Sequence, residues 1–184
     1  MRINNWKQFN IILESNENEK FMYHVTKSEN LENILQNGLL INQPYAMTEG
    51  GAWAEEAYGV NPIFLSEKPN ETTKQTLLLG DFDTILEVNI DGLELIADLP
   101  ALVDHGAYIG DNAEFLYWEE DEEPEEIIDL LDENGEIDME TLLDPGSWGM
   151  DDIIELTGSA AVLQNIDPSK IREIKLWELR NLPS

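Results

Sequence analysis

The chain has 184 residues, 42% of them apolar, which is enough to form one domain with a core of ordinary size. It contains no cysteine, which excludes disulfides, thiolate catalysis and cysteine-ligated zinc. Thirty-nine acidic residues against ten basic ones give a formal charge of −29, a balance that repels phosphate backbones and anionic membranes.

The first residues lack the apolar core of a signal peptide, and no stretch is apolar over a length that crosses a membrane. The absence of cysteine is typical of a reducing compartment. We therefore expect a cytoplasmic protein with no membrane contact and no stable direct binding to DNA or RNA. The acidic excess leaves three explanations open, namely solubility alone, a basic protein partner or mimicry of nucleic acid, and adaptation to high salt.

The first expected elements along the chain are a strand and a helix. A short apolar patch at 9–13 predicts a weak helix or a lead-in strand, and the aromatic and β-branched run at 21–25 predicts a buried strand. Ser28 is suited to cap the helix that follows, whose Leu and Ile residues recur at spacings of three and four. Gly38 is suited to end that helix.

The middle of the chain predicts three more strands. Residues 63–66 form a short apolar run, and residues 84–90 alternate between apolar and polar side chains. A turn at Asp91-Gly92 leads into a third strand at 93–96. The expected helices of this region lie at 53–58, 72–79 and 99–104.

An acidic stretch follows, with fourteen acids and no base between residues 119 and 144. Pairs of Ile and Leu interrupt the acids, which predicts short amphipathic helices docked on the domain. We interpret residues 119–150 as an acidic helical insertion in a single domain that spans 1–184. Residues 130–141 superficially resemble a calcium loop, but Leu130 and Thr141 occupy its two end-ligand positions, so the pattern indicates a turn.

The last expected elements are a helix at 151–156, a buried strand at 160–163, a turn or one helical turn at 167–171 and a final strand at 174–179. The fold class expected from this order is α+β. The histidines have no helix-spaced ligand partner, and no glycine-rich loop follows a strand as in nucleotide-binding folds. These absences leave one functional pattern to consider.

That pattern is Tyr23-His24-Val25-Thr26 followed by a helix that ends in Gly38-Leu39. A strand ending in His-x-Thr that feeds a helix ending in Gly-Leu resembles the opening of the His-type ADP-ribosyltransferases. It is similar to the DarT-type enzymes and, more distantly, to the RNA 2′-phosphotransferases. Residues 61–66 resemble the family's second motif strand, with Phe64 in place of the usual Tyr, and residues 160–171 resemble its closing strand and turn.

The resemblance implies a split β-sheet core with flanking helices and NAD as co-substrate. In such a domain His24 would anchor the dinucleotide, and Phe64 would stack on its nicotinamide ring. The other residues implied in cofactor binding are Tyr23, Thr26 and Ser66. The three motifs would then converge on one cavity.

The third motif departs from the family pattern, because Ala161 stands where the family carries a glutamate. The nearest polar substitute is Gln164, and Glu155 lies a few residues earlier. A glutamine can hydrogen-bond but cannot offset the positive charge that develops on the ribose. The resemblance therefore implies catalytic roles for His24 and Gln164 in a site that lacks the family's acid.

Two functions stay open. The first is an NAD-dependent mono-ADP-ribosyltransferase that modifies a macromolecule, with the acidic surface favouring a protein acceptor. The second is a binding protein that has lost the transfer chemistry, whose acidic surface mimics nucleic acid or blocks a basic partner. Phages and mobile elements encode acidic anti-defence inhibitors or toxins of that kind. A plainer alternative for each residue also stays open, with His24 as a hydrogen-bonded core histidine and Phe64 as an ordinary core residue.

Overall fold

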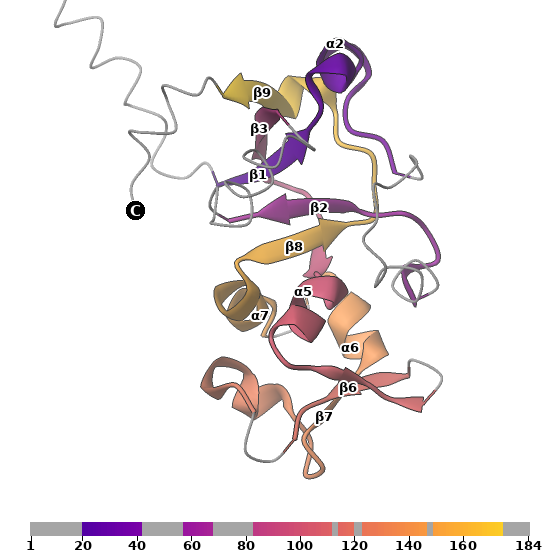
Figure 1. The fold of residues 1–184 in the computed structure, drawn as a ribbon, viewed down its shortest axis with the longest axis vertical. Coiled ribbons are helices and arrows are strands. Elements are labelled where there is room, and N and C mark those ends of the chain that lie inside the picture. Colours follow the sequence, from indigo (N-terminus) through magenta and orange to yellow (C-terminus); the bar gives the residue numbers. More distant parts are fainter. Residues whose placement is uncertain are drawn as a thin grey trace, which may run out of the picture.

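The computed structural model of the chain describes residues 20–41, 57–67, 83–111, 114–119, 123–146 and 149–174. They form an α+β fold with two antiparallel sheets (Figure 1). The six-stranded sheet has the order β4-β8-β2-β1-β3-β9, and the three-stranded sheet the order β5-β6-β7. The described strands are β1 (Phe21–Thr26), β2 (Ile63–Ser66), β3 (Thr84–Asn89), β4 (Leu95–Ala97), β5 (Tyr108–Ile109), β6 (Phe115–Tyr117), β7 (Glu136–Asp138), β8 (Ser159–Val162) and β9 (Ile171–Ile174).

The described helices are short and lie on both sides of the larger sheet. They are α2 (Ser28–Asn37), α5 (Leu99–Asp104), α6 (Met139–Leu143) and α7 (Met150–Thr157), with 3₁₀ turns η2 (Glu125–Leu130) and η3 (Pro168–Lys170). Figure 1 shows α2 at one end of the molecule and α5, α6 and α7 on the other side of β8 and β2. The expected α+β class is confirmed at this level. Among these described helices, none is long and apolar enough to cross a membrane.

Two apolar cores occupy the two faces of the six-stranded sheet, because successive side chains of a strand alternate between faces. The first core joins the sheet to α5, α6 and α7, and its members include Ile96, Leu99, Leu116, Ile153 and Ala161. The second core lies under α2 and contains Met22, Ile34, Leu65, Leu86 and Ile166.

The start of α2 differs from the expectation for Ser28. The helix begins at Ser28 itself, and the preceding residue Lys27 makes no side-chain cap. The Ser28 backbone N–H and its hydroxyl both donate to the carboxylate of Asp83, which lies 55 residues away at the start of β3. These hydrogen bonds hold the pKa of Asp83 below its usual value. The prediction that Ser28 caps its own helix is therefore wrong, and the capping carboxylate comes from a distant strand.

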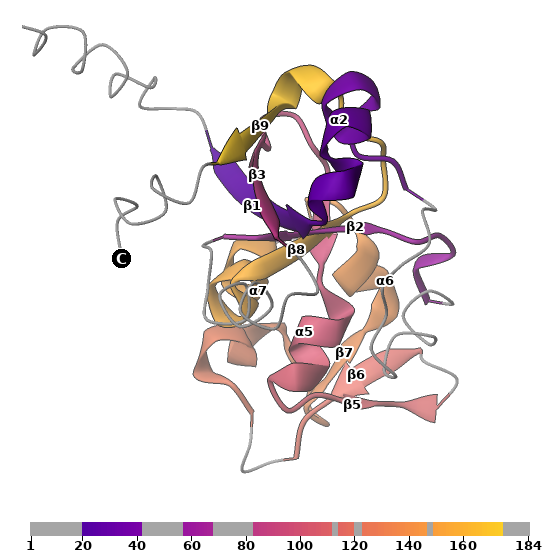
Figure 2. The same cartoon turned by 45° about the horizontal axis from the view of Figure 1, so that its top comes forward.

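Three short strands, within and just before the acidic stretch, were not predicted from the sequence pattern. Figure 2 shows β5, β6 and β7 together at the end of the molecule remote from α2. The region 119–150 was expected to be helical, but β7 lies inside it, between η2 and α6. A turn precedes β7, where the Asp132 carboxylate accepts hydrogen bonds from the backbone N–H groups of Asn134 and Glu136. This turn confirms the turn expected within 130–141.

The remaining elements lie close to their expected positions. The strands at 21–25, 63–66, 84–90 and 160–163 and the helices at 99–104 and 151–156 are confirmed within one or two residues. The strand expected at 93–96 begins later, at Leu95. The turn or single helical turn expected at 167–171 is confirmed by η3, and the last described strand, Ile171–Ile174, begins before the strand expected at 174–179. The expected elements at 9–13 and 72–79, most of the helix at 53–58 and nearly all of the strand at 174–179 lie outside the described residues.

Candidate functional site

His24 is a half-buried residue near the end of β1 whose imidazole is hydrogen-bonded to the neighbouring strand. Its Nδ1 lies 2.9 Å from the Phe64 carbonyl oxygen. Because a carbonyl only accepts, Nδ1 carries the proton and Nε2 is left as the acceptor. Burial lowers the pKa of His24 below its ordinary value, and the hydrogen bond to Phe64 offsets part of that effect. The imidazole is therefore neutral at pH 7.

The predicted cofactor residues divide between the two faces of the sheet. Met22, His24 and Thr26 lie on one face of β1 because they are two residues apart, and Met22 belongs to the core under α2. Phe64 packs against the opposite core, where its ring meets Tyr58 edge-on at 6.1 Å. The histidine and the aromatic ring thus extend to opposite sides of the sheet. As described, they do not frame one dinucleotide pocket.

The third motif lies on β8 and the segment that follows it. The Ala161 methyl group is fully buried, and Ala161 is the direct neighbour of Phe64 on β2 and of Ile96 on β4. Gln164 is half-buried beyond the end of β8, in the bend before Ile166. Glu155 is exposed on α7. The residue that replaces the family's acid is therefore part of the apolar core, and Gln164 lies outside it.

Tyr23 and Ser66 are brought together by the strand pairing. They are direct partners between β1 and β2, and Ser66 in turn pairs with Ser159 of β8. Burial raises the pKa of Tyr23, with Glu87 on β3 adding to the rise and Arg172 on β9 opposing it. A row of polar side chains thus crosses the face of the sheet opposite His24.

Asp98 extends this polar environment and was missed by the sequence reasoning. It directly follows β4, is buried, and caps α5 by accepting a hydrogen bond from the Ala101 N–H at 3.1 Å. Burial raises the pKa of Asp98 to about 6, against the lowering effect of that N–H. A sequence signal was present, because Asp before Leu-Pro is a typical helix N-cap pattern.

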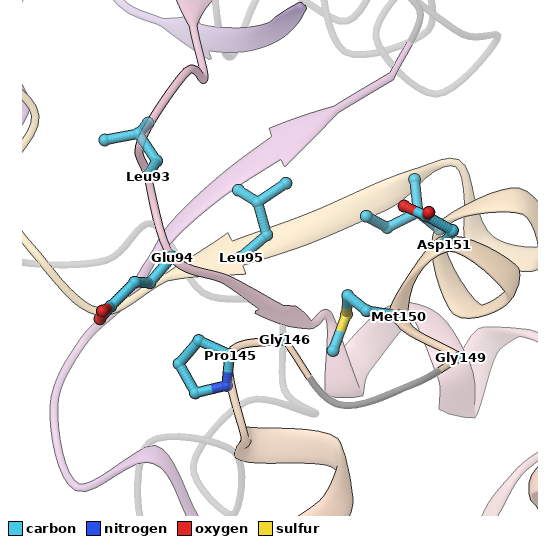
Figure 3. Close-up of a pocket in the computed structure, with 9 residues that line it drawn as sticks. Leu93, Glu94, Leu95, Pro145, Gly146, Gly149, Met150 and Asp151 are labelled. Carbon is cyan, nitrogen blue, oxygen red and sulfur yellow. The ribbon is translucent and has the colours of Figure 1, made fainter.

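A cleft of about 480 Å³ lies at the edge of the six-stranded sheet, between the approach to β4 and the start of α7 (Figure 3). Its surface is polar and apolar in about equal parts, with the carboxylates of Glu94 and Asp151 at opposite ends of the lining. The remaining lining residues are Leu93, Leu95, Pro145, Gly146, Gly149, Met150 and Ile154. None of the predicted cofactor or catalytic residues contributes to this cleft.

The strongest electrostatic feature is the separation of charge along the chain. Residues 98–157, which run from the N-cap of α5 to the end of α7, hold 21 Asp and Glu and no Lys or Arg, and we call them the acidic lobe. The basic residues of the described ranges are Lys20, Lys27, Lys170 and Arg172, on or beside β1, α2, η3 and β9. Among the described residues, the negative charge is therefore densest at one end of the molecule.

Within the part of the chain that the structure describes, no three His, Asp or Glu side chains are grouped so that they could hold a metal ion. The chain matches no protein-family model, and no similar protein was found among curated sequences or solved structures. The resemblance to ADP-ribosyltransferases accordingly stays a prediction from the sequence motifs.

Proposed function

We propose that this chain is a binding protein that engages a basic protein partner through its acidic lobe. The observation that carries the proposal is the charge separation, with 21 acids and no Lys or Arg in residues 98–157. Two basic side chains of the opposite end make local interactions. Arg172 pairs with Glu87 at 2.9 Å, and Lys170 Nζ donates to the Asp91 carbonyl oxygen.

Concentrating like charges on one lobe costs folding free energy through self-repulsion. The same arrangement speeds the encounter with an oppositely charged partner and repels competing anions. Exposed carboxylates on η2 and on the turn before β7 present this charge to solvent. A partner with a cationic groove, such as a protein that itself binds nucleic acid, fits the lobe best.

The proposal is tested with two quadruple variants of equal charge change, measured against a nona-arginine peptide by titration calorimetry. The lobe variant carries Glu125→Gln, Glu126→Gln, Asp129→Asn and Glu133→Gln, and the control variant carries Glu29→Gln, Glu32→Gln, Glu67→Gln and Asp91→Asn. All eight side chains are exposed. We expect the lobe variant to bind about tenfold more weakly than wild type, and the control variant to change by less than about twofold.

Salt dependence and a nucleic-acid control complete the test. Binding to the peptide should weaken steeply as salt rises, because the contacts are between exposed charges. A labelled DNA duplex should show no binding at any salt concentration tested. Equal weakening by the two quadruple variants, or no binding of the peptide to wild type, would contradict a localised acidic surface.

One observation favours a second candidate, an NAD-dependent mono-ADP-ribosyltransferase. The three strands that carry the family-like motifs, β1, β2 and β8, are consecutive neighbours in the sheet. This adjacency supports the resemblance, whereas the opposite orientations of His24 and Phe64 and the buried Ala161 count against the activity.

The second candidate predicts that NAD binds and that binding depends on His24. Calorimetry of NAD against wild type and His24→Ala measures this directly, and labelled NAD with candidate basic proteins reports transfer. Heat of binding that disappears in His24→Ala would support the transferase. If the wild type does not bind NAD at millimolar concentration, the transferase candidate is excluded.

A further inference from the structure

The three-stranded sheet at the end of the acidic lobe has one apolar face and one mixed aromatic and acidic face. Leu116 and Ile137 are paired between β6 and β7, are buried, and belong to the first core. Their neighbours along the strands point the other way because side chains alternate. That outward face carries Tyr108, Phe115, Tyr117, Glu136 and Asp138.

A row of three side chains crosses this face. Tyr117 of β6 is the direct partner of Tyr108 on β5 and of Glu136 on β7. Side chains at directly opposed positions lie within contact distance on one face of a sheet. The rings of Tyr108 and Tyr117 are stacked, with their centroids 5.4 Å apart and an angle of 26° between their planes. An aromatic pair thus lies directly beside a carboxylate.

The rest of the face surrounds this row with a third ring and further acids. The Phe115 ring lies 6.2 Å from that of Tyr117 and covers Gly110, where an added Cβ would lie 2.3 Å from the ring. Phe115 therefore serves the packing of the small sheet. Asp138 accepts hydrogen bonds from Thr141 N–H and Oγ–H, so its carboxylate caps the N-terminus of α6.

Tyr108 is 43% exposed, although the lobe that carries it is otherwise strongly anionic at its surface. An exposed ring in such a setting suits a cation that can also lie flat on it. Arginine meets both requirements, since its planar guanidinium stacks on aromatic faces and donates two parallel hydrogen bonds to a carboxylate. A lysine ammonium is a strongly hydrated point charge and gains less from the same surface.

We propose that the outward face of the three-stranded sheet binds arginine side chains of a basic partner segment, with the guanidinium against the Tyr108–Tyr117 pair and hydrogen-bonded to Glu136. This inference rests on the proposed function and names the place on the acidic lobe where arginine is selected. The field of the whole lobe attracts the cationic segment, and this row distinguishes arginine from lysine.

The test compares nona-arginine with nona-lysine, which carry the same charge, by calorimetry at fixed salt. Wild type should bind nona-arginine about five- to tenfold more tightly than nona-lysine. Tyr117→Leu and Glu136→Gln should each abolish that preference, whereas Tyr117→Phe should keep it because the aromatic face remains. Ile128→Ala, at an exposed apolar residue of η2 outside this face, should leave the preference unchanged.

The outcomes separate this inference from the proposed function. If the lobe variant weakens both peptides while Tyr117→Leu and Glu136→Gln keep the arginine preference, the acidic lobe binds cations and the aromatic row has no part in it. If no variant weakens either peptide, both proposals fail. If circular dichroism shows that Tyr117→Leu does not fold, the arginine preference of Glu136→Gln and Tyr108→Leu tests the inference instead. If the variants alter self-association in sedimentation instead of peptide affinity, the face is an interface between copies and the inference is overturned.

Discussion

Gly38 follows α2 directly and lies against the backbone of Ile166. Its φ is +84°, and a Cβ placed on it would lie 2.0 Å from the Ile166 carbonyl oxygen. The same contact region carries two backbone hydrogen bonds between Leu39 and Ile166. Gly38→Ala must therefore strain the backbone and separate these segments, and we expect a loss of about 3 kcal/mol in the free energy of unfolding, measured by chemical denaturation.

Gly92 provides the matched control for Gly38. It also has a positive φ, +73°, but an added Cβ would meet nothing within 4 Å. Gly92→Ala should therefore cost only the backbone term, about 1 kcal/mol. Equal losses in the two variants would show that the close approach to Ile166 contributes nothing to stability.

The sequence indicated Gly38 as a helix-ending residue but could not show why alanine is excluded there. A glycine with positive φ is expected where a helix ends, so this feature is visible in the local sequence. The contact with Ile166 joins residues far apart in the chain, so the local sequence does not show it. The same limit applies to the candidate site. In the run Phe21–Val25 no apolar and polar alternation distinguishes the two faces, so the sequence could not show that His24 and Phe64 point apart.

At the scale of elements, long alternating or periodic segments were predictable and three-residue strands were not. The six residues of β3 and the ten of α2 repeat their apolar pattern often enough to identify the element. β6 and β7 have three residues each, too few for a period to be recognised, and their pairing decides their structure. The sequence near α2 could not predict its cap either, because the capping carboxylate belongs to Asp83, 55 residues away and just before β3.

The helix α5 offers a prediction about pH, because its cap Asp98 is buried. The folded-state pKa of about 6 exceeds the ordinary value of 3.8, so between these pH values the folded state holds more protons than the unfolded state. This group therefore lowers stability as pH rises through that window, by at most about 3 kcal/mol. Asp98→Asn keeps a capping side chain without the charge, and it should make the protein more stable than wild type at pH 7.5.

The measurement is the difference in unfolding free energy between wild type and Asp98→Asn at pH 4.5 and at pH 7.5. Comparing the two proteins cancels the titration of the other carboxylates, which they share. The advantage of the variant should be larger at pH 7.5. A difference that is the same at both pH values would show that Asp98 has an ordinary pKa in the folded protein.

At the scale of the whole molecule, the separation of charge links stability to function. A chain with a formal charge of −29 repels itself most strongly in its compact state, and the acidic lobe concentrates that repulsion in residues 98–157. The basic side chains near β9 and η3 are engaged at the other end, so they do not offset the field of the lobe. A cationic partner and added salt should therefore act in the same direction on stability.

Sodium chloride should raise the melting temperature, because it shortens the range of repulsion from about 10 Å at 0.1 M to about 3 Å at 1 M. Relief of about 2 kcal/mol corresponds to roughly 5 °C for a chain of this length. The rise should be smaller in the quadruple lobe variant than in wild type, since that variant starts with fewer charges on the lobe. It should also be the same in potassium chloride, because screening depends on ionic strength. A melting temperature that falls with salt would mean that attractive pairs outweigh repulsion, and the acidic lobe would then be an internally compensated surface with no excess field for a basic partner.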